Sequence, residues 1–184
     1  MRNAVAALLL AIPVLAAPAT AALKEGTNAA DFTTQGALAG KVMTINLKKA
    51  LKKGPVVLYF FPAAFTPGCS AEARAFAANI DAFAKQGATV IGMSADPIDK
   101  LADFSTKDCA SKFTVARADP AVIRAYDVAR EFTDGNGSTR LYTDRTSYVI
   151  GTDGRVIYSY SDPSAAQHVK NTLAAVQAYK AKHP

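Results

Sequence analysis

PVVLYFFPAAFTPGCSAEARAF, residues 55–76, is the stretch of sequence that determines the fold, and it contains the residue of greatest chemical interest, Cys69. An uninterrupted apolar run at 55–61 precedes a turn rich in Pro, Ala and Gly at 62–68. Apolar runs of this length between turn signals are typical of strands buried on both faces at the centre of an α/β sheet. The sequence therefore predicts a central strand that ends where the turn begins.

A helix is predicted to start beside Cys69. Thr66 is a favourable N-cap residue, and Pro67 follows it at the first helical position, where proline is preferred. Cys69 would then lie in the first turn, where unpaired backbone N–H groups and the positive end of the helix dipole favour a thiolate. A thiol between a central strand and a helix start is well placed for chemistry.

The rest of the chain alternates predicted strands and helices, which indicates an α/β fold with a mixed central sheet and helices on both faces. A hairpin is expected at 31–47, ahead of the central strand, as an N-terminal extension at the sheet edge. Asp153-Gly154 gives the strongest hairpin signal, between two alternating segments. The other expected elements are strands at 88–95 and 114–118, helices at 97–112 and 163–182, a helical turn at 119–126 and a polar loop at 133–144.

Residues 1–21 have the features of a secretory signal peptide: one Arg, a short Ala/Leu-rich core and a small-residue end before Ala22. The alternative is an uncleaved anchor, but the apolar part is shorter than the roughly 20 residues that a membrane span needs. We therefore expect export, to the periplasm of a Gram-negative bacterium or into the medium, without stable membrane association after cleavage. Residues 22–184 would form a single domain of ordinary size.

The whole chain has a net charge of +6, which raises the question of a nucleic-acid partner. Part of the excess lies on a short helix-like segment whose Leu47 and Leu51 are available for an inner face. Such a segment is more typical of a solvated charged face than of a binding patch, so no nucleic-acid partner is expected. The lysines concerned are Lys48, Lys49, Lys52 and Lys53.

PAAFTPGCSAE, residues 62–72, resembles the P-x-x-x-T-P-x-C-x-x-E signature of the peroxiredoxins, in particular the bacterioferritin-comigratory (Q-type) branch. The preceding VVLYFFP is similar to that branch too, and the resemblance extends from about Leu23 to the last helix. It implies a thioredoxin-like fold and a thioredoxin-dependent type of peroxidase, in which Cys69 reduces hydrogen peroxide and organic hydroperoxides. The sequence departs from the family at Ala30, where proline is usual, at the periphery of the fold.

The chemistry that the resemblance implies requires Cys69 as a thiolate, which attacks the O–O bond and becomes a sulfenic acid. A free cysteine is more often a small buried apolar residue, but the helix start and the signature favour a nucleophile here. A helix terminus stabilises the thiolate only in part, and Glu72, three residues on, would oppose it if ionised. A nearby cation is therefore required.

Arg145 is the candidate cation. RTSYVI, residues 145–150, resembles the strand start at which the family carries its active-site arginine. An arginine stays charged and offers a planar fork of donors, so it can hold the thiolate and stabilise oxygen charge in the transition state. Arg140 is an alternative, and Arg145 is preferred because the strand that follows it matches the family.

Four further residues of the turn and helix start complete the expected site. Thr66 has two interpretations that are compatible: an N-cap, and, by the resemblance, a hydroxyl that hydrogen-bonds the peroxide. Pro62 would shape and shield the pocket. Glu72 would orient neighbouring donors, or simply complement the helix dipole. The backbone N–H groups of Gly68 and Cys69 would bind the peroxide oxygen, as helix N-termini bind anions.

Cys109 is the second of two cysteines and lies in the expected helix at 97–112, among polar neighbours that indicate an exposed thiol. Some Q-type members carry a resolving cysteine at the position of Ser105, one turn earlier on the same face, which implies an intramolecular Cys69–Cys109 disulfide. The other family position, five residues after the nucleophile, is Arg74. Because bridged Cα atoms lie within about 7 Å, both segments should rearrange in each cycle. The alternatives are an idle thiol, or a non-catalytic thioredoxin-like redox or binding module with a permanent disulfide.

No metal or cofactor is expected. The two histidines, His168 and His183, lie far in sequence from either cysteine, and no C-x-x-C or glycine-rich nucleotide loop is present. The expected partners are a peroxide substrate and a dithiol reductant, which is a thioredoxin-like or other exported thiol carrier. The resemblance also implies a monomer.

Overall fold

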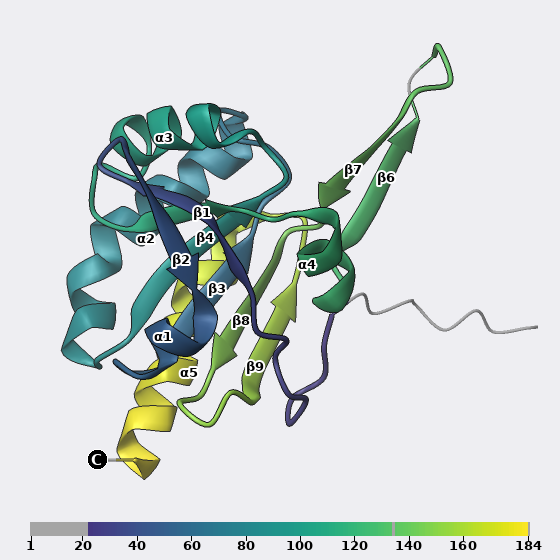
Figure 1. The fold of residues 1–184 in the computed structure, drawn as a ribbon. Coiled ribbons are helices and arrows are strands. Elements are labelled where there is room, and N and C mark those ends of the chain that lie inside the picture. The colour runs from purple at the N-terminus through teal and green to yellow at the C-terminus, as the bar shows by residue number, and fades with distance from the viewer. Residues whose placement is uncertain (1–21, 134, 184) are drawn as a thin grey trace, which may run out of the picture.

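The computed structural model describes residues 22–133 and 135–183, so the expected signal peptide at 1–21 lies outside the described residues. A sheet of seven strands has the order β2-β1-β5-β4-β3-β8-β9 (Figure 1). Within the described part of the chain, no helix is both long and apolar enough to cross a membrane. The seven strands are β1 (Thr33–Leu38), β2 (Lys41–Asn46), β3 (Val56–Phe60), β4 (Thr89–Ser94), β5 (Thr114–Arg117), β8 (Thr146–Ile150) and β9 (Val156–Ser161).

The sheet is mixed, and β3 lies near its centre. β3 pairs in parallel with β4, which pairs in parallel with β5, whereas β8 runs antiparallel to β3. All five residues of β3 are buried. Val57 and Tyr59 point into one core and Leu58 and Phe60 into the other. A strand covered on both faces has no polar side, which is why its sequence reads as an unbroken apolar run.

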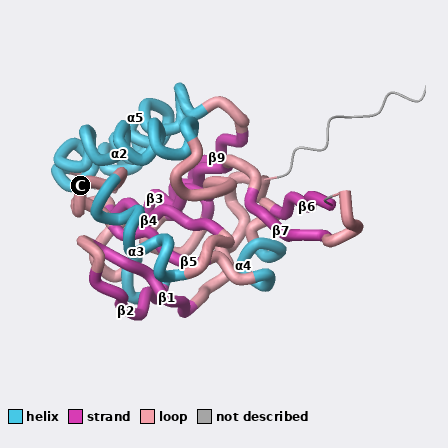
Figure 2. Tube along the Cα trace, turned by 90° about the horizontal axis from the view of Figure 1, so that it is seen from above, coloured by secondary structure: helices cyan, strands magenta, loops and turns pink. Residues whose placement is uncertain are grey.

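Helices cover both faces of the sheet, as Figures 1 and 2 show. Side chains of α2, α3 and α5 contribute to the core that contains Tyr59, and those of α1 and α4 contribute to the core that contains Phe60. The α/β fold class is confirmed, with the β1–β2 hairpin as N-terminal extension. The helices are α1 (Leu47–Leu51), α2 (Pro67–Lys85), α3 (Ile98–Lys107), α4 (Pro120–Ala125) and α5 (His168–Lys182), with the 3-10 turn η1 (Ala165–Gln167) before α5.

Only one of the two strands in the expected edge hairpin lies at the edge of the sheet. β2 is the edge strand, while β1 lies between β2 and β5. The hairpin turns at Ala39 and Gly40, which both have positive φ. Gly36 lies within β1, where an added Cβ would come within 2.6 Å of the Ile45 side chain. A glycine inside a strand can thus mark close packing as well as a turn.

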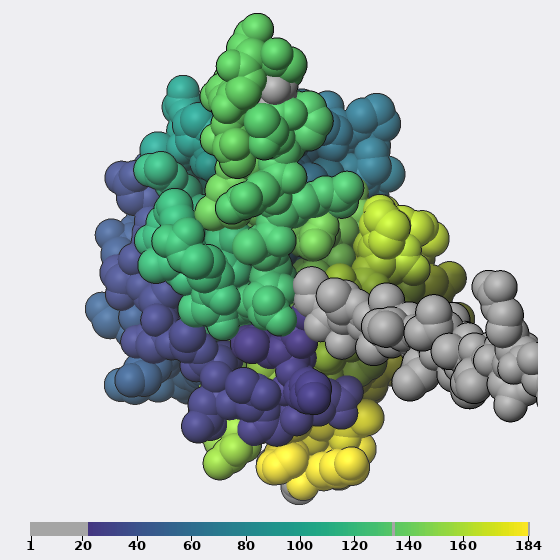
Figure 3. All heavy atoms as spheres, turned by 90° about the vertical axis from the view of Figure 1, so that its right-hand side faces the viewer, coloured from purple at the N-terminus to yellow at the C-terminus, as the bar shows by residue number. Residues whose placement is uncertain are grey.

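The prediction of a polar loop at 133–144 is wrong. β6 (Ala129–Thr133) and β7 (Thr139–Thr143) form an antiparallel two-stranded sheet that projects from the body of the molecule (Figures 1 and 3). Every residue of β6 is exposed, and Phe132 retains 59% of its accessible surface. Because neither face of β6 is buried, the segment has no apolar alternation by which a strand is recognised.

The prediction of a helix from 97 to 112 is wrong at its C-terminal end. α3 ends at Lys107, so Cys109 lies two residues beyond the helix. Ala110 and Ser111 have φ values of 50° and 58°, in the left-handed region. A right-handed helix cannot continue through two such residues, although their side chains are common in helices.

Candidate active site

Cys69 is the third residue of α2 and is buried. The chain reaches it through Phe65, whose φ of 67° is unusual for a bulky residue, and through Thr66 at the N-cap position. The capping role predicted for the Thr66 side chain is wrong: its hydroxyl donates to the Ala63 carbonyl, at 3.0 Å, and makes no cap hydrogen bond. The Thr66 backbone carbonyl accepts from Ser70 N–H at 2.8 Å and so starts the helix.

The sheet register brings Arg145 to Cys69. β8 runs antiparallel to β3 with Thr146 opposite Phe60, so the residue before β8 lies beside the end of β3. Arg145 Nη2 lies 3.3 Å from Cys69 Sγ, and Nε donates to the Pro163 carbonyl at 2.9 Å. Both side chains are buried, which strengthens the electrostatic interaction between them. Arg140, the alternative cation, lies on β7, where it is exposed.

Glu72 completes a buried group of three charged or ionisable side chains. Its Oε2 forms an ion pair with Arg145 Nη1, one turn of α2 after Cys69. Its Oε1 has no hydrogen-bond partner. Burial raises the pKa of Glu72 to about 7, against the opposing effect of Arg145. One guanidinium therefore serves both the cysteine sulfur and a carboxylate that is only partly ionised near neutral pH.

His168 is a neighbour of this group that the sequence did not single out. The ring is fully buried at the start of α5, with Nε2 3.0 Å from the Asp162 carbonyl and Nδ1 2.8 Å from Ser147 Oγ. Since a carbonyl only accepts, Nε2 carries the proton and Nδ1 accepts from Ser147 in the neutral ring. Burial lowers the pKa of His168, which favours that neutral form. Nδ1 lies 3.8 Å from Glu72 Oε1, a contact that only tertiary packing creates.

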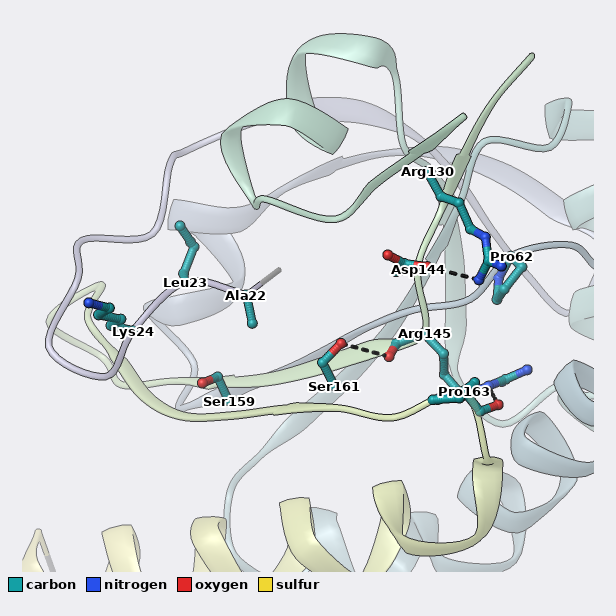
Figure 4. A pocket seen from close by; sticks show the side chains of 10 residues that line it. All are labelled: Ala22, Leu23, Lys24, Pro62, Arg130, Asp144, Arg145, Ser159, Ser161 and Pro163. Atoms are coloured by element: carbon teal, nitrogen blue, oxygen red, sulfur yellow. Dashed lines mark hydrogen bonds and ion pairs between the residues drawn. The ribbon is translucent and has the colours of Figure 1, made fainter. Parts of the chain in front are cut away.

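Gly68 and Pro62 shape the space around Arg145. A Cβ added to Gly68 would lie 3.3 Å from Arg145 Nη2, so the absence of a side chain allows the guanidinium its close approach. Pro62 and Arg145 also line a cavity of about 510 Å³ (Figure 4). The cavity is lined by Ala22, Leu23, Lys24, Pro62, Arg130, Asp144, Arg145, Ser159, Ser161 and Pro163.

The expectation that Cys109 is exposed is wrong. Its side chain has 0% exposure, in the same core cluster as Cys69, Phe104 and Phe113. Burial, and secondarily the charge of Asp108, raise the pKa of the Cys109 thiol. The polar neighbours that indicated exposure flank the segment, while the cysteine itself turns inward after α3 ends. Both cysteines are free in this structure.

Tyr59 on β3 is a second buried residue that the sequence did not single out. Its hydroxyl is fully buried and has no hydrogen-bond partner. Burial, together with Cys109, Glu72 and Cys69, raises its pKa, so the phenol stays neutral. Among the described residues, no group of three His, Cys, Asp or Glu side chains is arranged to hold a metal ion.

The chain resembles known proteins in both sequence and structure. The model of the AhpC/TSA family matches residues 26–159. The chain is 32% identical over 124 residues to Peroxiredoxin Bcp of Xanthomonas campestris pv. campestris, covering 67% of this chain and 77% of that protein. It is 31% identical over 113 residues to Peroxiredoxin Bcp of Escherichia coli, covering 61% and 72%.

Solved structures show the same relationship. Peroxidoxin BcpB from Mycobacterium tuberculosis superposes with a TM-score of 0.75 at 32% identity, over 85% of this chain and 97% of that one. Peroxiredoxin Q of Xanthomonas campestris gives a TM-score of 0.68 at 29% identity, over 79% and 90%. These structures share the mixed sheet and its flanking helices with the present chain.

Proposed function

The chain belongs to the AhpC/TSA family of peroxiredoxins and is a peroxidase, and from this premise we propose that Cys69 is the residue that attacks the peroxide. The observation that carries the proposal is the 3.3 Å contact between Arg145 Nη2 and Cys69 Sγ, at a helix N-terminus. A guanidinium and a helix start both favour the anion of a buried thiol. The thiolate is the form that reacts with peroxides.

The proposed reaction transfers one oxygen atom to sulfur. The Cys69 thiolate attacks the terminal peroxide oxygen, the O–O bond breaks, and the leaving oxygen takes up a proton to become water or an alcohol. Sulfur is oxidised by two electrons to the sulfenic acid, and the peroxide is reduced by two. Charge develops on both oxygens during the attack, and Arg145 stabilises it from its fixed position.

The residues around Cys69 would hold the peroxide. The N–H groups of Gly68 and Cys69 lie in the first turn of α2, where no helical carbonyl is available to accept from them. The Thr66 hydroxyl donates its own proton to Ala63, so its oxygen is left as an acceptor for a peroxide O–H. Glu72 orients Arg145 through their ion pair. Pro62, which has no N–H, shapes the mouth of the site.

The proposed substrates are hydrogen peroxide and organic hydroperoxides. One structure of the Xanthomonas campestris bacterioferritin comigratory protein is described as giving insights into alkyl peroxide reduction. In the present chain, the cavity of about 510 Å³ that reaches Pro62 and Arg145 has room for an alkyl group, although Cys69 and Thr66 are not among its lining residues. We infer no cofactor for the reaction.

In the proposed second step, Cys109 resolves the oxidised Cys69. The Cys109 thiolate attacks the sulfur of the sulfenic acid, hydroxide leaves and is protonated to water, and a disulfide forms. An exported dithiol reductant then restores both thiols by exchange. The alternative of a permanent Cys69–Cys109 bridge in a non-catalytic module finds no support, since both cysteines are free and the relatives are peroxiredoxins.

The experiment is stopped-flow peroxide reduction by the reduced protein, with quenched samples analysed by mass spectrometry. Wild type should consume one equivalent of peroxide rapidly and form an intramolecular bridge, while Cys69→Ser should do neither. Cys109→Ala should form no intramolecular bridge, and its Cys69 sulfenic acid should react with further peroxide and accumulate as over-oxidised Cys69. Wild-type peroxide consumption by Cys69→Ser would refute the assignment of Cys69, and unchanged turnover by Cys109→Ala would make this a one-cysteine enzyme.

Arg145→Lys and Arg140→Lys are a matched pair for the cation. Lysine keeps the charge and loses the planar fork, so Arg145→Lys should slow the reaction with peroxide by about 100-fold, the scale of a lost oxyanion donor. Arg140 is exposed on β7, and Arg140→Lys should react like wild type. The reverse pattern would assign the role to Arg140.

A further inference from the structure

The carboxylate of Asp108 connects the two segments that carry the cysteines. Its Oδ2 accepts a hydrogen bond from Ser70 Oγ at 2.9 Å, and its Oδ1 forms an ion pair with Arg74 Nη1. Ser70 and Arg74 lie one turn apart on α2, and Asp108 is the C-cap residue of α3. The Asp108 side chain is only 11% exposed, so water screens its hydrogen bond with Ser70 little.

Each end of this connection adjoins a cysteine. Ser70 follows Cys69 directly, and Asp108 precedes Cys109 directly. After Asp108, Ser111 N–H donates to the Ser105 carbonyl at 2.9 Å, within the same segment and α3. Lys112 Nζ reaches α2 by donating to the Ala77 carbonyl at 3.2 Å, two turns beyond Ser70. Asp108 thus holds the end of α3 to the first turns of α2, and loss of its contacts would loosen the two segments that must move for a disulfide to form.

We propose that Asp108 is a positioning residue whose bonds to Ser70 and Arg74 act as a latch and set the rate at which Cys109 reaches the oxidised Cys69. The proposal rests on the proposed function of Cys109. A hydrogen bond to a buried charged group is among the stronger side-chain interactions. Both bonds must break before the first turn of α2 can unwind away from the end of α3. A closed latch prolongs the life of the sulfenic acid.

The latch also gives a role to Arg74. Arg74 occupies the place at which other peroxiredoxins carry a resolving cysteine, and here its guanidinium reaches across to the segment of Cys109 instead. Its side chain is 61% exposed, so the ion pair alone is screened on one side. The buried hydrogen bond from Ser70 is therefore the stronger half of the latch.

The direct test uses Asp108→Asn and Ser70→Ala, with Asp103→Asn as control. Asp103 lies on the same helix and carries the same charge, but its ion pair with Lys107 is exposed. Reduced protein is mixed with one equivalent of peroxide, and quench-flow mass spectrometry follows the sulfenic acid and the disulfide. A second series with excess peroxide follows the sulfinic acid. The quantity compared is the rate of bridge formation relative to the rate of sulfenic acid formation.

Both latch variants should form the bridge about tenfold faster than wild type, which corresponds to about 1.4 kcal/mol. They should also give less sulfinic acid at high peroxide, because the sulfenic acid is shorter-lived. Asp103→Asn should match wild type in both measurements. Unchanged bridge formation in Ser70→Ala and Asp108→Asn would overturn the proposal.

A second role for Asp108 has to be separated from the latch. Cys109 interacts electrostatically with Asp108 and with Tyr59, so removing the Asp108 charge also eases ionisation of the attacking thiol. Ser70→Ala keeps that charge. If only Asp108→Asn forms the bridge faster, and the pH profile of bridge formation moves to lower pH, Asp108 acts through ionisation and the latch is wrong.

Hydrogen exchange on the reduced protein tests the latch without any chemistry at Cys109. Amides at 68–70 and 109–112 should exchange faster in Ser70→Ala and Asp108→Asn than in Asp103→Asn. If wild type forms no Cys69–Cys109 bridge, the resolving function is wrong, yet the exchange result still decides whether the latch exists. Equal exchange in all three variants would refute it.

Discussion

At the scale of single residues, one guanidinium has to serve two acceptors. Arg145 contacts Cys69 Sγ through Nη2 and Glu72 through Nη1, and both acceptors are buried. An ionised Glu72 holds Arg145 in place but partly cancels its charge, whereas a protonated Glu72 leaves the charge to the sulfur. The raised pKa of Glu72, about 7, places this balance within the physiological range.

The Glu72→Gln variant should show how this buried carboxyl affects stability. Its pKa is raised from 4.5 to about 7 on folding, so the folded protein keeps a proton that the unfolded chain releases. Wild-type stability should therefore fall, relative to Glu72→Gln, as pH rises from 4.5 through 7, by roughly 3 kcal/mol in total. Urea unfolding of both proteins between pH 4.5 and 8 measures the difference.

His168 is present in both proteins, but its Nδ1 lies 3.8 Å from Glu72 Oε1, so its contribution cancels only in part. Its pKa is lowered by burial, so its own effect has the opposite sign: stability is lost as pH falls below about 6.5. A difference between wild type and Glu72→Gln that is independent of pH would show that the carboxyl titrates normally in the folded protein.

Gly68→Ala should slow the reaction with peroxide more than it affects stability. The added Cβ would lie 3.3 Å from Arg145 Nη2, so the guanidinium must shift by a few tenths of an ångström away from Cys69. Gly68 has no positive φ and is exposed, so unfolding in urea should change by less than about 1 kcal/mol. Stopped-flow rates and unfolding midpoints, with exposed Ala71→Gly as control, test this split.

At the scale of elements, the antiparallel pairing of β8 with β3 assembles the site. The strand brings Arg145 from 76 residues away to the sulfur of Cys69. The projecting β6–β7 hairpin is tied to the same sheet end, because Thr143 Oγ1 donates to the Phe61 carbonyl, at 2.7 Å, directly before Pro62. The positions of Arg145 and of the turn that begins at Pro62 thus both depend on strands that meet at one end of β3.

Thr143→Val should destabilise the protein through this bond. Valine matches the shape of threonine but leaves the buried Phe61 carbonyl without the hydroxyl donor, at a cost of about 1 to 3 kcal/mol. Thr133→Val is the control, since Thr133 shares its hydroxyl hydrogen bond with Thr139 in an exposed part of the same hairpin. Equal unfolding midpoints for the two variants would mean that the Thr143 bond contributes nothing.

At the scale of the whole molecule, the residues that follow the expected signal peptide pack against the core that contains Phe60. Leu23 N–H donates to the Tyr148 hydroxyl, at 3.1 Å, and Gly26 N–H donates to the Val156 carbonyl at 2.7 Å. Ala22 and Leu23 pack against that core and line the cavity beside Arg145. Ala22 and Leu23, the first two described residues, thus belong to the packed structure.

Expression of the full chain in a Gram-negative host should give a periplasmic protein whose mass corresponds to a start at Ala22. The short apolar core and the small residues before Ala22 are the physical basis of this prediction. A chain without residues 1–21 is the control and should stay in the cytoplasm. Recovery of full-length protein in the membrane fraction would contradict cleavage, and sedimentation of the mature form tests the expected monomer.

The sequence by itself determined the central strand, the start of α2 and the order of most elements. These features depend on local physical chemistry: an unbroken apolar run, an N-cap followed by proline, and Asp-Gly in a hairpin. The cysteine at the helix start belongs to the same local pattern. The place of Cys69 in the first turn of α2 was predictable because the residues that set it are its neighbours along the chain.

Only the tertiary structure decided the surroundings of Arg145, His168 and Cys109. Their contacts join segments that are far apart in sequence, and the end of α3 is set by two left-handed residues that have no sequence signal. Burial of Cys109 depends on which way the chain turns there, and the hairpin of β6 and β7 has no buried face to give it a pattern. The spacing of apolar residues in a segment indicates how that segment packs against a core. It gives no information where the segment faces solvent or contacts a single distant side chain.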